Sequence, residues 1–464
     1  MKKVQQEDLQ MKIPALLHLS RLGYGYLSRE EVRRRDRKTN IFPEALRAAA
    51  ERINGRCLTA EQAARLLADL QAQLEAEDLG RQFYRTLRDG WNGLRLIDFE
   101  HPENNLFQSA AELACGTGSG SFRPDITLFV NGLPLAMIEV KAGNRPQGLR
   151  AEYHRMTERL RSREGRSFLQ GAQIWAFSDD HAEDSARLLP TEGTFYTSAM
   201  RSDFPVFPAG EKRFGPYPGL LPRNQEAVSG ILADNGIQEP PRTRAFRKSL
   251  SPDKTTHRML TALFQPERFL FFLRYGIQYI RETDAAGYPS LTRRILTTEQ
   301  LAGLNALKQK AKRGYRNWTL PYGGAAGREA VNASLIALLR DLIPGARLYW
   351  ISAGNRELFR DQEAFQACEI SCAGQFYAKA GQLILVTAEP DPETVLRDAS
   401  ELGFTGRRVF ILPQSATRYE QKTGFSAGLR KADPEAVLIT RITEPPLFPR
   451  RPLSYSEPEK RSDG

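Results

Sequence analysis

Residues 121–141 read SFRPDITLFVNGLPLAMIEVK, and the rest of the chain is organised around this stretch. Residues 126–130 form an apolar run rich in β-forming side chains, and residues 133–140 form a second apolar run. Between the two runs stands Asn131-Gly132, a dipeptide that is typical of two-residue hairpin turns. The stretch therefore predicts two antiparallel strands joined by a tight turn.

Charged residues interrupt this apolar hairpin at its open end. Asp125 precedes the first strand, whereas Glu139 and Lys141 flank Val140 on the second and project from the same face. A charge in an apolar strand is costly unless it is paired or holds a metal. We therefore predict that Asp125, Glu139 and the carbonyl of Val140 bind Mg²⁺ or Mn²⁺ and that Lys141 positions or activates a water. On this interpretation Asp125, Glu139 and Lys141 are the catalytic residues of a phosphodiester hydrolase.

The same residues also fit a plain structural interpretation, a solvated Asp at a turn and a Glu and a Lys on an edge strand. However, Pro124-Asp125 followed by Glu139-Val140-Lys141 resembles the PD-(D/E)xK nuclease motif. The words RPDITLFVNG and PLAMIEVK resemble, almost letter for letter, the R (restriction) subunit of type I restriction-modification enzymes. The resemblance implies a metal-dependent endonuclease that cuts double-stranded DNA in the cytoplasm as a defence against foreign DNA.

Further segments carry the same resemblance. Residues 10–17 and 22–27 are similar to the opening of that family's nuclease domain, and residues 99–105 are similar to the segment before its first core strand. Residues 265–270 resemble its junction between nuclease and motor. The resemblance extends over residues 10–362 and implies possible partners, the methylation and specificity subunits of a restriction complex.

One helix departs from the family pattern. The family usually carries a Gln-x-x-x-Tyr pair downstream of the active-site lysine, but Arg155 and Arg159 occupy those positions here. Two arginines can meet DNA phosphates, but they cannot replace the acceptor of the glutamine. The alternative therefore stays open that the chain is a non-catalytic DNA-binding or assembly subunit, or a regulator, of a restriction-type defence complex.

The first helix is expected over residues 8–22, and it does not supply a clear third metal ligand. Many nucleases of this superfamily place an acidic residue on this helix. The present chain offers Glu7 and Asp8 only at its start, with Lys12 and Pro14 nearer its middle. We therefore assign no third carboxylate.

Composition and charge favour a DNA-binding globular protein. The 464 residues include 66 Lys and Arg against 55 Asp and Glu, a net charge of +11 that lowers the cost of approaching a polyphosphate. Basic residues cluster at Arg33, Arg34, Arg35, Arg37 and Lys38, at Arg159, Arg161, Arg163 and Arg166, and at Arg242, Arg244, Arg247 and Lys248. Each run alone is typical of a solvated face. Together with the nuclease motif they favour DNA as a partner.

Cysteines and hydropathy exclude other classes. The four cysteines Cys57, Cys115, Cys368 and Cys372 are too few and too scattered for a disulfide framework. Cys368 and Cys372 lack further ligands nearby for zinc, so we interpret them as reduced thiols. No signal peptide and no apolar run of about 18 residues is found, which predicts a cytoplasmic protein with no membrane partner.

Hydrophobic periodicity predicts the order of elements in the N-terminal part. We expect a helical insertion over residues 43–94, a helix over 151–161 and a strand over 173–177, which gives an αβββαβ core with the hairpin. Residues 205–241 are rich in Pro and Gly and predict a linker with one helix near 223–233. Residues 255–280 predict regular helix, packed by Leu260, Leu263, Phe264, Phe269, Phe272 and Leu273.

From Thr297 onward the order of elements resembles a RecA-like motor whose nucleotide chemistry is missing. Gln300 stands where such motors place an adenine-reading glutamine, and a glycine-rich segment, residues 322–329, precedes an expected helix over 330–342. A working phosphate loop needs Lys and then Ser or Thr, but Arg328 and Glu329 stand there. Near residue 444, where an Asp-Glu pair is expected, only Glu444 could serve. ATP is therefore not expected as a cofactor, and an ATP-driven translocase is the least favoured interpretation.

These observations predict an α/β protein with four parts. A restriction-endonuclease-like (PD-(D/E)xK) core with helical insertions occupies residues 1–204, and a linker and helical connector occupies 205–290. A degenerate RecA-like parallel α/β domain follows over 291–450, and a charged tail over 451–464. The family's target recognition lies in a separate specificity subunit, so the sequence names no DNA target.

Overall fold

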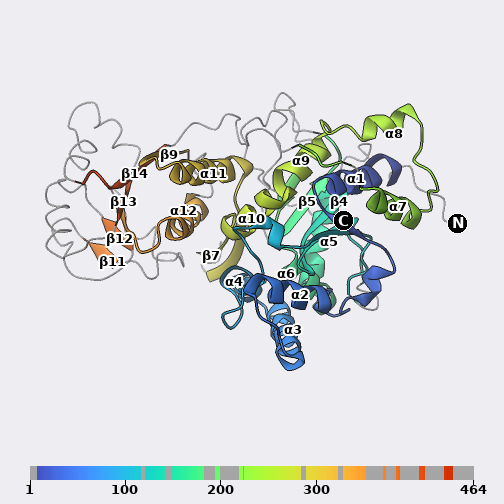
Figure 1. Ribbon diagram of the computed structural model, residues 1–464, viewed down its shortest axis with the longest axis horizontal. Helices are drawn as coiled ribbons and strands as arrows, with labels where there is room; N and C mark the ends of the chain where they lie inside the picture. Colours follow the sequence, from blue (N-terminus) through green and yellow to red (C-terminus); the bar gives the residue numbers. More distant parts are fainter. Residues whose placement is uncertain are drawn as a thin grey trace, which may run out of the picture.

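The computed structural model describes residues 8–116, 121–141, 148–181, 194–198, 219–222, 224–283, 289–321, 328–351, 369–371, 383–386, 407–412 and 433–442. These ranges form a mixed α/β protein with two six-stranded sheets and one two-stranded sheet. In Figure 1 the first sheet lies on the right among most of the helices, and the second lies on the left beside α11 (Thr298–Lys312) and α12 (Arg328–Leu342).

The first sheet carries the predicted hairpin at its centre. Its strand order is β1-β2-β3-β4-β5-β6, with β1 parallel to β2, β4 parallel to β5, and the other neighbours antiparallel. The strands are β1 (Gly25–Leu27), β2 (Phe107–Ala111), β3 (Ile126–Val130), β4 (Leu133–Val140), β5 (Ile174–Ser178) and β6 (Phe195–Thr197). The predicted strands at the hairpin and at residues 173–177 are confirmed.

Helices cover both faces of this sheet. One face packs on α1 (Ile13–Arg21), which follows a π-helical turn at Asp8–Lys12, and on α7 (Gln225–Asp234), α9 (Thr255–Phe264) and α10 (Pro266–Tyr275). The other face packs on α5 (Gly148–Arg161) and α6 (Arg163–Gly171), which connect β4 to β5. Along the chain α1, β2, β3, β4, α5 and β5 follow in the expected helix, three strands, helix, strand order.

The hairpin turn is held by buried amides. Asn131 and Gly132 have φ angles of 53° and 78°, the left-handed conformations that a type I′ turn requires. The Asn131 side chain accepts from the backbone N–H of Leu106 and donates to the carbonyl of Leu96 and to Oδ1 of Asn105. Asn105 in turn accepts from the N–H of Asp98 and donates to its carbonyl. The turn is therefore fixed to the loop that precedes β2.

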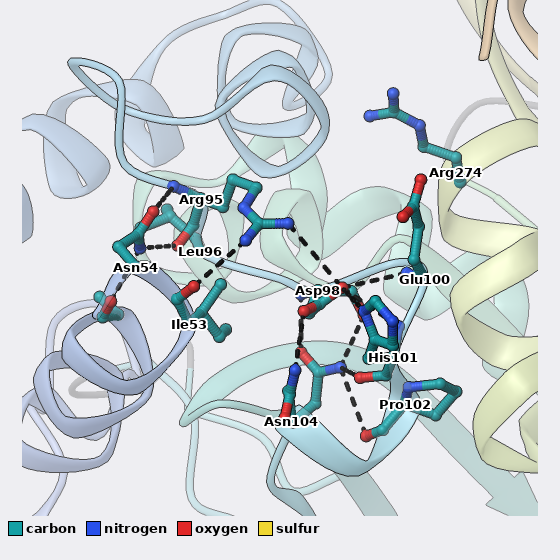
Figure 2. Close-up of polar contacts among 12 residues, drawn as sticks. Ile53, Asn54, Arg95, Leu96, Asp98, Glu100, His101, Pro102, Asn104 and Arg274 are labelled. Carbon is teal, nitrogen blue, oxygen red and sulfur yellow. Dashed lines mark hydrogen bonds and ion pairs between the residues drawn. The ribbon is translucent and has the colours of Figure 1, made fainter.

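Asp98 organises this loop from within. Its carboxylate is only 3% exposed and accepts from the backbone N–H groups of Glu100 and His101 and from Nδ2 of Asn104. Figure 2 shows these groups converging on Asp98, with Arg95 reaching toward it from the opposite side. The hydrogen bonds lower the pKa of Asp98 although burial alone would raise it. The loop includes a short 3-10 helix at Pro102–Asn104 and delivers the chain into β2.

The predicted helical insertion forms three helices, α2 (Pro43–Asn54), α3 (Ala60–Glu75) and α4 (Arg81–Asp89). They project below the first sheet in Figure 1. A capping box between Thr59 and Gln62 starts α3, and its leucines, Leu66, Leu70 and Leu74, are buried. A 3-10 helix at Glu31–Arg34 precedes this insertion, and α8 (Arg244–Ser249) lies between α7 and α9.

The prediction of regular helix over residues 255–280 is wrong at its C-terminal end. Pro266 starts a second helix, α10, and the chain leaves it at Gly276. Ile277 then begins β7 (Ile277–Thr283), which pairs with β8 (Pro289–Ile295) as an antiparallel hairpin. The reason is a pairing partner far along the chain, because Ile277 lies opposite Ile295. The predicted core leucines and phenylalanines of α9 and α10 are buried as expected.

The second sheet consists of parallel pairs only. Its order is β11-β12-β10-β13-β14-β9, and it packs with α11 (Thr298–Lys312) and α12 (Arg328–Leu342). The strands are β9 (Asn317–Pro321), β10 (Arg347–Ile351), β11 (Glu369–Ser371), β12 (Leu383–Val386), β13 (Arg408–Leu412) and β14 (Val437–Ile442). The buried face of α12 contains Val331, Leu335, Ile336, Leu338 and Leu339. Cys368, Cys372 and Glu444, and the side chains of Arg328 and Glu329, lie outside the described residues.

Polar contacts join the hairpin of β7 and β8 and α12 to the N-terminal part. Arg293 on β8 is fully buried, and its guanidinium donates to the carbonyls of Leu79, Leu169, Gln170 and Ala172, three of them at the C-terminal end of α6. Arg274 on α10 pairs with Asp341 on α12 at 3.0 Å. The two sheets are therefore parts of one connected structure.

Candidate functional site

The hairpin brings the three predicted catalytic residues together at its open end. The Nζ of Lys141 lies 3.7 Å from Oδ2 of Asp125 and 3.9 Å from Oε2 of Glu139. The backbone N–H of Val140 donates to Oδ2 of Asp125 at 2.9 Å, which fixes that carboxylate against β4. All of these residues stand where β3 begins and β4 ends. Their roles in catalysis and metal binding remain predictions.

A bulge in β4 places Asp125 and Glu139 on the same face. Near the turn Val130 pairs with Leu133, and this register, continued, would set Asp125 opposite Ile138. The register shifts between Leu128 and Phe129, so that Ile126 pairs with Ile138 instead. Asp125 therefore comes opposite Glu139. Directly opposed residues of an antiparallel pair share a face, so the extra residue in β4 is what makes the carboxylates converge.

The carboxylate of Glu139 lies in an unusual environment. It is 3% exposed, and within the described part of the chain its Oε1 has no hydrogen-bond partner. Burial raises the pKa of Glu139 well above its usual value, the negative charges of Asp125 and Glu152 raise it further, and Lys141 opposes them. A carboxylate that is buried, has an oxygen without a donor and is surrounded by excess negative charge would be stabilised by a bound cation.

A divalent cation fits this donor set. Mg²⁺ is commonly held by one or two carboxylates, while waters and substrate phosphates supply the other ligands. Asp125 and Glu139 provide two carboxylates, and Oε1 of Glu139, to which no described residue donates a hydrogen bond, provides an acceptor. Across the described ranges no group of three or more His, Cys, Asp or Glu side chains is placed to hold a metal. Any metal here would therefore depend on two carboxylates, backbone oxygen and solvent or substrate.

The first helix is preceded by a buried lysine, Lys12, in the region where we considered a third metal-binding carboxylate. Lys12 is 3% exposed, and its Nζ lies 2.7 Å from Oδ1 of Asp8 and 2.5 Å from Oε1 of Glu112. Burial lowers the pKa of Lys12, but the hydrogen bonds to Asp8 and Glu112 outweigh it, and the net shift is upward. Asp8 and Glu112 are thus both paired with Lys12. Glu7 lies outside the described residues.

Residues 4–182 match the family model described as Type I restriction enzyme R protein N terminus. This range starts before α1, contains the hairpin and ends just after β5. These residues belong to the type I R-protein N-terminal family. The R-protein region thus includes Asp125, Glu139 and Lys141 and the helices α1 to α6.

Curated relatives agree with this assignment. The chain is 26% identical over 286 residues to the "Type I restriction enzyme HindI endonuclease subunit" of Haemophilus influenzae, an alignment that covers 57% of this chain and 22% of the relative. It is 44% identical over 50 residues to a provisionally named type I restriction enzyme MjaVIIIP endonuclease subunit of Methanocaldococcus jannaschii, which covers 11% of this chain and 5% of the relative. The chain thus spans about a fifth of the length of the first relative. Among its described helices none is long and apolar enough to cross a membrane.

The R-protein region contains one acidic residue at the site that sequence reasoning missed. Glu152 on α5 is 7% exposed, pairs with both Arg155 and Arg159, and contributes to the raised pKa of Glu139. In the sequence it looks like an ordinary exposed ion pair, because Arg155 follows at i+3. Only its burial against the sheet distinguishes Glu152 from a residue in an exposed ion pair. Arg155 and Arg159, the departures from the R-subunit pattern, thus stand beside the candidate site.

Proposed function

We propose that this chain contains a metal-dependent DNA endonuclease module of the type I restriction R-subunit lineage, acting in the cytoplasm against foreign DNA. The observation that carries the proposal is the convergence of Asp125, Glu139 and Lys141 around a buried carboxylate oxygen that has no hydrogen-bond partner among the described residues. The family match over residues 4–182 supports the same assignment. The fold of this part is accordingly proposed to be a PD-(D/E)xK core, and its substrate to be double-stranded DNA.

The proposed chemistry assigns one role to each side chain. Bound Mg²⁺ or Mn²⁺ would polarise a phosphate oxygen and lower the pKa of a coordinated water. Asp125 and Glu139 hold the cation, with the carbonyl of Val140 as a further ligand. Lys141, within 4 Å of both carboxylates, orients the attacking water and offsets the negative charge that develops on the phosphate. The N–H of Val140 keeps Asp125 oriented toward Glu139.

The C-terminal part is proposed to be a degenerate RecA-like domain that does not use ATP. Its parallel sheet, with β9 leading toward α12, supports a motor-like arrangement. Gln300, which stands at the position of an adenine-reading residue, instead closes a capping box with Thr297 at the start of α11. We propose the same four parts of the chain as the sequence predicts, residues 1–204, 205–290, 291–450 and 451–464. Methylation and specificity subunits are the proposed partners.

A second candidate is a non-catalytic DNA-binding or assembly subunit of a restriction-type complex. The specific observation that favours it is the replacement of the usual Gln-x-x-x-Tyr pair by Arg155 and Arg159, whose guanidinium groups turn to Glu152. In this alternative the hairpin persists as a scaffold, and the arginines contribute only to DNA affinity.

Plasmid cleavage separates the two candidates. The full chain is incubated with supercoiled plasmid and Mg²⁺ or Mn²⁺, with and without ATP, beside Asp125→Asn and Lys141→Ala. Asp253→Asn is the matched control, because it removes one carboxylate at an exposed position. Metal-dependent nicking that the two site variants lose and Asp253→Asn keeps supports the endonuclease. DNA binding without cleavage under every metal condition supports the second candidate.

A further inference from the structure

We infer that Arg155 and Arg159, held in place by the buried carboxylate of Glu152, bind a backbone phosphate of DNA beside Asp125 and Glu139. The inference rests on the proposed action on DNA and assigns a substrate subsite to two residues that depart from the family pattern. It is carried by the contacts of α5 with the sheet and with the segment that leads into β3.

Glu152 contacts both arginines. Its carboxylate accepts from Nη2 of Arg155, and its Oε1 lies 3.6 Å from Nη1 of Arg159. The Glu152 side chain is 10% exposed, whereas those of Arg155 and Arg159 are 56% and 31% exposed. A carboxylate buried to this extent needs charged partners, and holding two guanidinium groups restricts the rotamers of both. The arginines are thus anchored at one side and open to solvent at the other.

The contacts of Arg159 and Tyr153 place this part of α5 near the segment before Asp125 and near the strand that pairs with Glu139. The guanidinium of Arg159 stacks over the ring of Phe122 at 4.9 Å, and Phe122 stands three residues before Asp125. On the other side Tyr153, the neighbour of Glu152, packs against Phe177, which pairs with Glu139 in the strand register. The charge of Glu152 also reaches Glu139 and raises its pKa. Glu152 therefore lies on the face of the sheet that carries Glu139, and Arg159 lies over the segment that leads to Asp125.

Charge explains why arginines at this place favour a phosphate. Asp125 and Glu139 repel an approaching phosphodiester, and the single positive charge of Lys141 does not offset both. Two guanidinium groups against one Glu152 carboxylate add one net positive charge. A guanidinium carries five N–H donors in a plane, so a bond to Glu152 leaves donors free for phosphate oxygens. Neutral glutamine and tyrosine side chains would add no such charge.

Arg155 provides the cleanest test because its side chain is 56% exposed, and circular dichroism checks that the fold is kept after its substitution. Binding of a labelled DNA duplex to the full chain is measured in EDTA, so that the result does not depend on a metal, at salt concentrations of roughly 50 to 200 mM. Arg155→Gln is compared with Arg161→Gln, an exposed arginine at the end of the same helix that changes the net charge equally. We expect Arg155→Gln to weaken binding on the order of 5-fold and to reduce the salt slope by about 1. Arg161→Gln is expected to change both less.

Glu152→Gln tests whether Glu152 positions the two arginines. Net charge alone and positioning predict opposite changes in DNA affinity for this substitution. Removing a negative charge beside the DNA strengthens binding if only net charge matters. If Glu152 holds the arginines in place, the substitution instead weakens binding, although the protein becomes more positive. Stronger binding by Glu152→Gln, or equal effects of Arg155→Gln and Arg161→Gln, overturns the inference while leaving the proposed function intact. A wild-type chain that binds no duplex at any salt concentration overturns both.

Discussion

Asp125 lies opposite Glu139 across the pair of β3 and β4 because β4 carries one extra residue, Leu135, between the positions paired with Leu128 and Phe129. A hairpin without this bulge would direct the two carboxylates to opposite faces of the sheet. The Asn131-Gly132 turn sets the register at one end, and the bulge corrects it before the site. The geometry of the site is thus a property of strand register as much as of the acidic residues themselves.

Metal binding is expected to require both carboxylates. Asp125→Ala leaves Glu139 as one buried carboxylate, a poor site for a hard cation, so Mn²⁺ binding is expected to disappear from calorimetric titrations. The wild-type chain should bind Mn²⁺ with micromolar-to-millimolar affinity. Asp253→Asn, at an exposed position, should titrate like the wild type. An unchanged isotherm for Asp125→Ala would show that the cation binds elsewhere.

The sequence predicts the hairpin because its signals are local. Asn131-Gly132 between two apolar runs fixes the turn, and the positions of Asp125 and Glu139 at the strand ends follow from it. The bulge at Leu135 could not be predicted, because Leu133, Leu135 and Ala136 are all apolar and give no sign of which residue is skipped. Faces of a strand buried on both sides cannot be told apart by hydrophobic alternation.

Non-local contacts account for the other differences. Residues 277–280 continue an apolar helical segment, which predicts helix, yet they pair with residues 292–295 in a hairpin. Glu152 has the spacing of a surface ion pair, and only the packing of Tyr153 against β5 shows that it is buried. Spacing along one helix specifies neighbours on that helix, but it does not specify what covers them.

Acid is expected to destabilise the packing of α1 on α9. His18 and His257 stack face to face with ring centroids 4.4 Å apart. Burial, with the charges of His257 and Arg21, lowers the pKa of His18 to about 2, and burial, with the charge of Lys254, lowers the pKa of His257 to about 4. Both values lie below the ordinary 6.5, so the unfolded chain takes up protons first as the pH falls. Their contribution is complete above about pH 6.5 and is lost as the pH falls, toward 4 for His257 and toward 2 for His18.

Denaturant titrations at several pH values measure this effect. The free energy of unfolding is expected to fall on the order of 3 kcal/mol between pH 6.5 and 4 through His257 alone. His257→Gln should remove the part of this dependence that His257 contributes and leave the part of His18, whereas His154→Gln, which replaces an exposed histidine, should keep the whole dependence. Parallel pH profiles for wild type and His257→Gln would mean that other groups control acid unfolding.

Arg293 is expected to be essential for docking the hairpin of β7 and β8 on the R-protein region. Its guanidinium is fully buried and donates to four carbonyls, three of them at the negative end of α6. Arg293→Met keeps the apolar stem but leaves these carbonyls unsatisfied, which costs on the order of 3 kcal/mol. The midpoint of urea unfolding measures the loss. Arg281→Met, on the exposed side of the same hairpin, is the control and should change the midpoint little.

The C-terminal part is expected to resemble a motor in shape only. Its fold depends on apolar patterning, and the buried face of α12 from Val331 to Leu339 retains that patterning. Nucleotide binding depends instead on a few polar side chains, and Arg328 and Glu329 stand where Lys and Ser or Thr are needed. A carboxylate at position 329 would repel phosphate oxygens. We therefore expect no DNA-stimulated ATP hydrolysis in a phosphate-release assay and little binding of Mg-ATP up to millimolar concentration.

The double substitution Arg328→Lys with Glu329→Ser should not create turnover, because Gln300 remains committed to the α11 capping box. DNA-stimulated turnover by the unmodified chain that Arg328→Ala abolishes would instead identify a working motor.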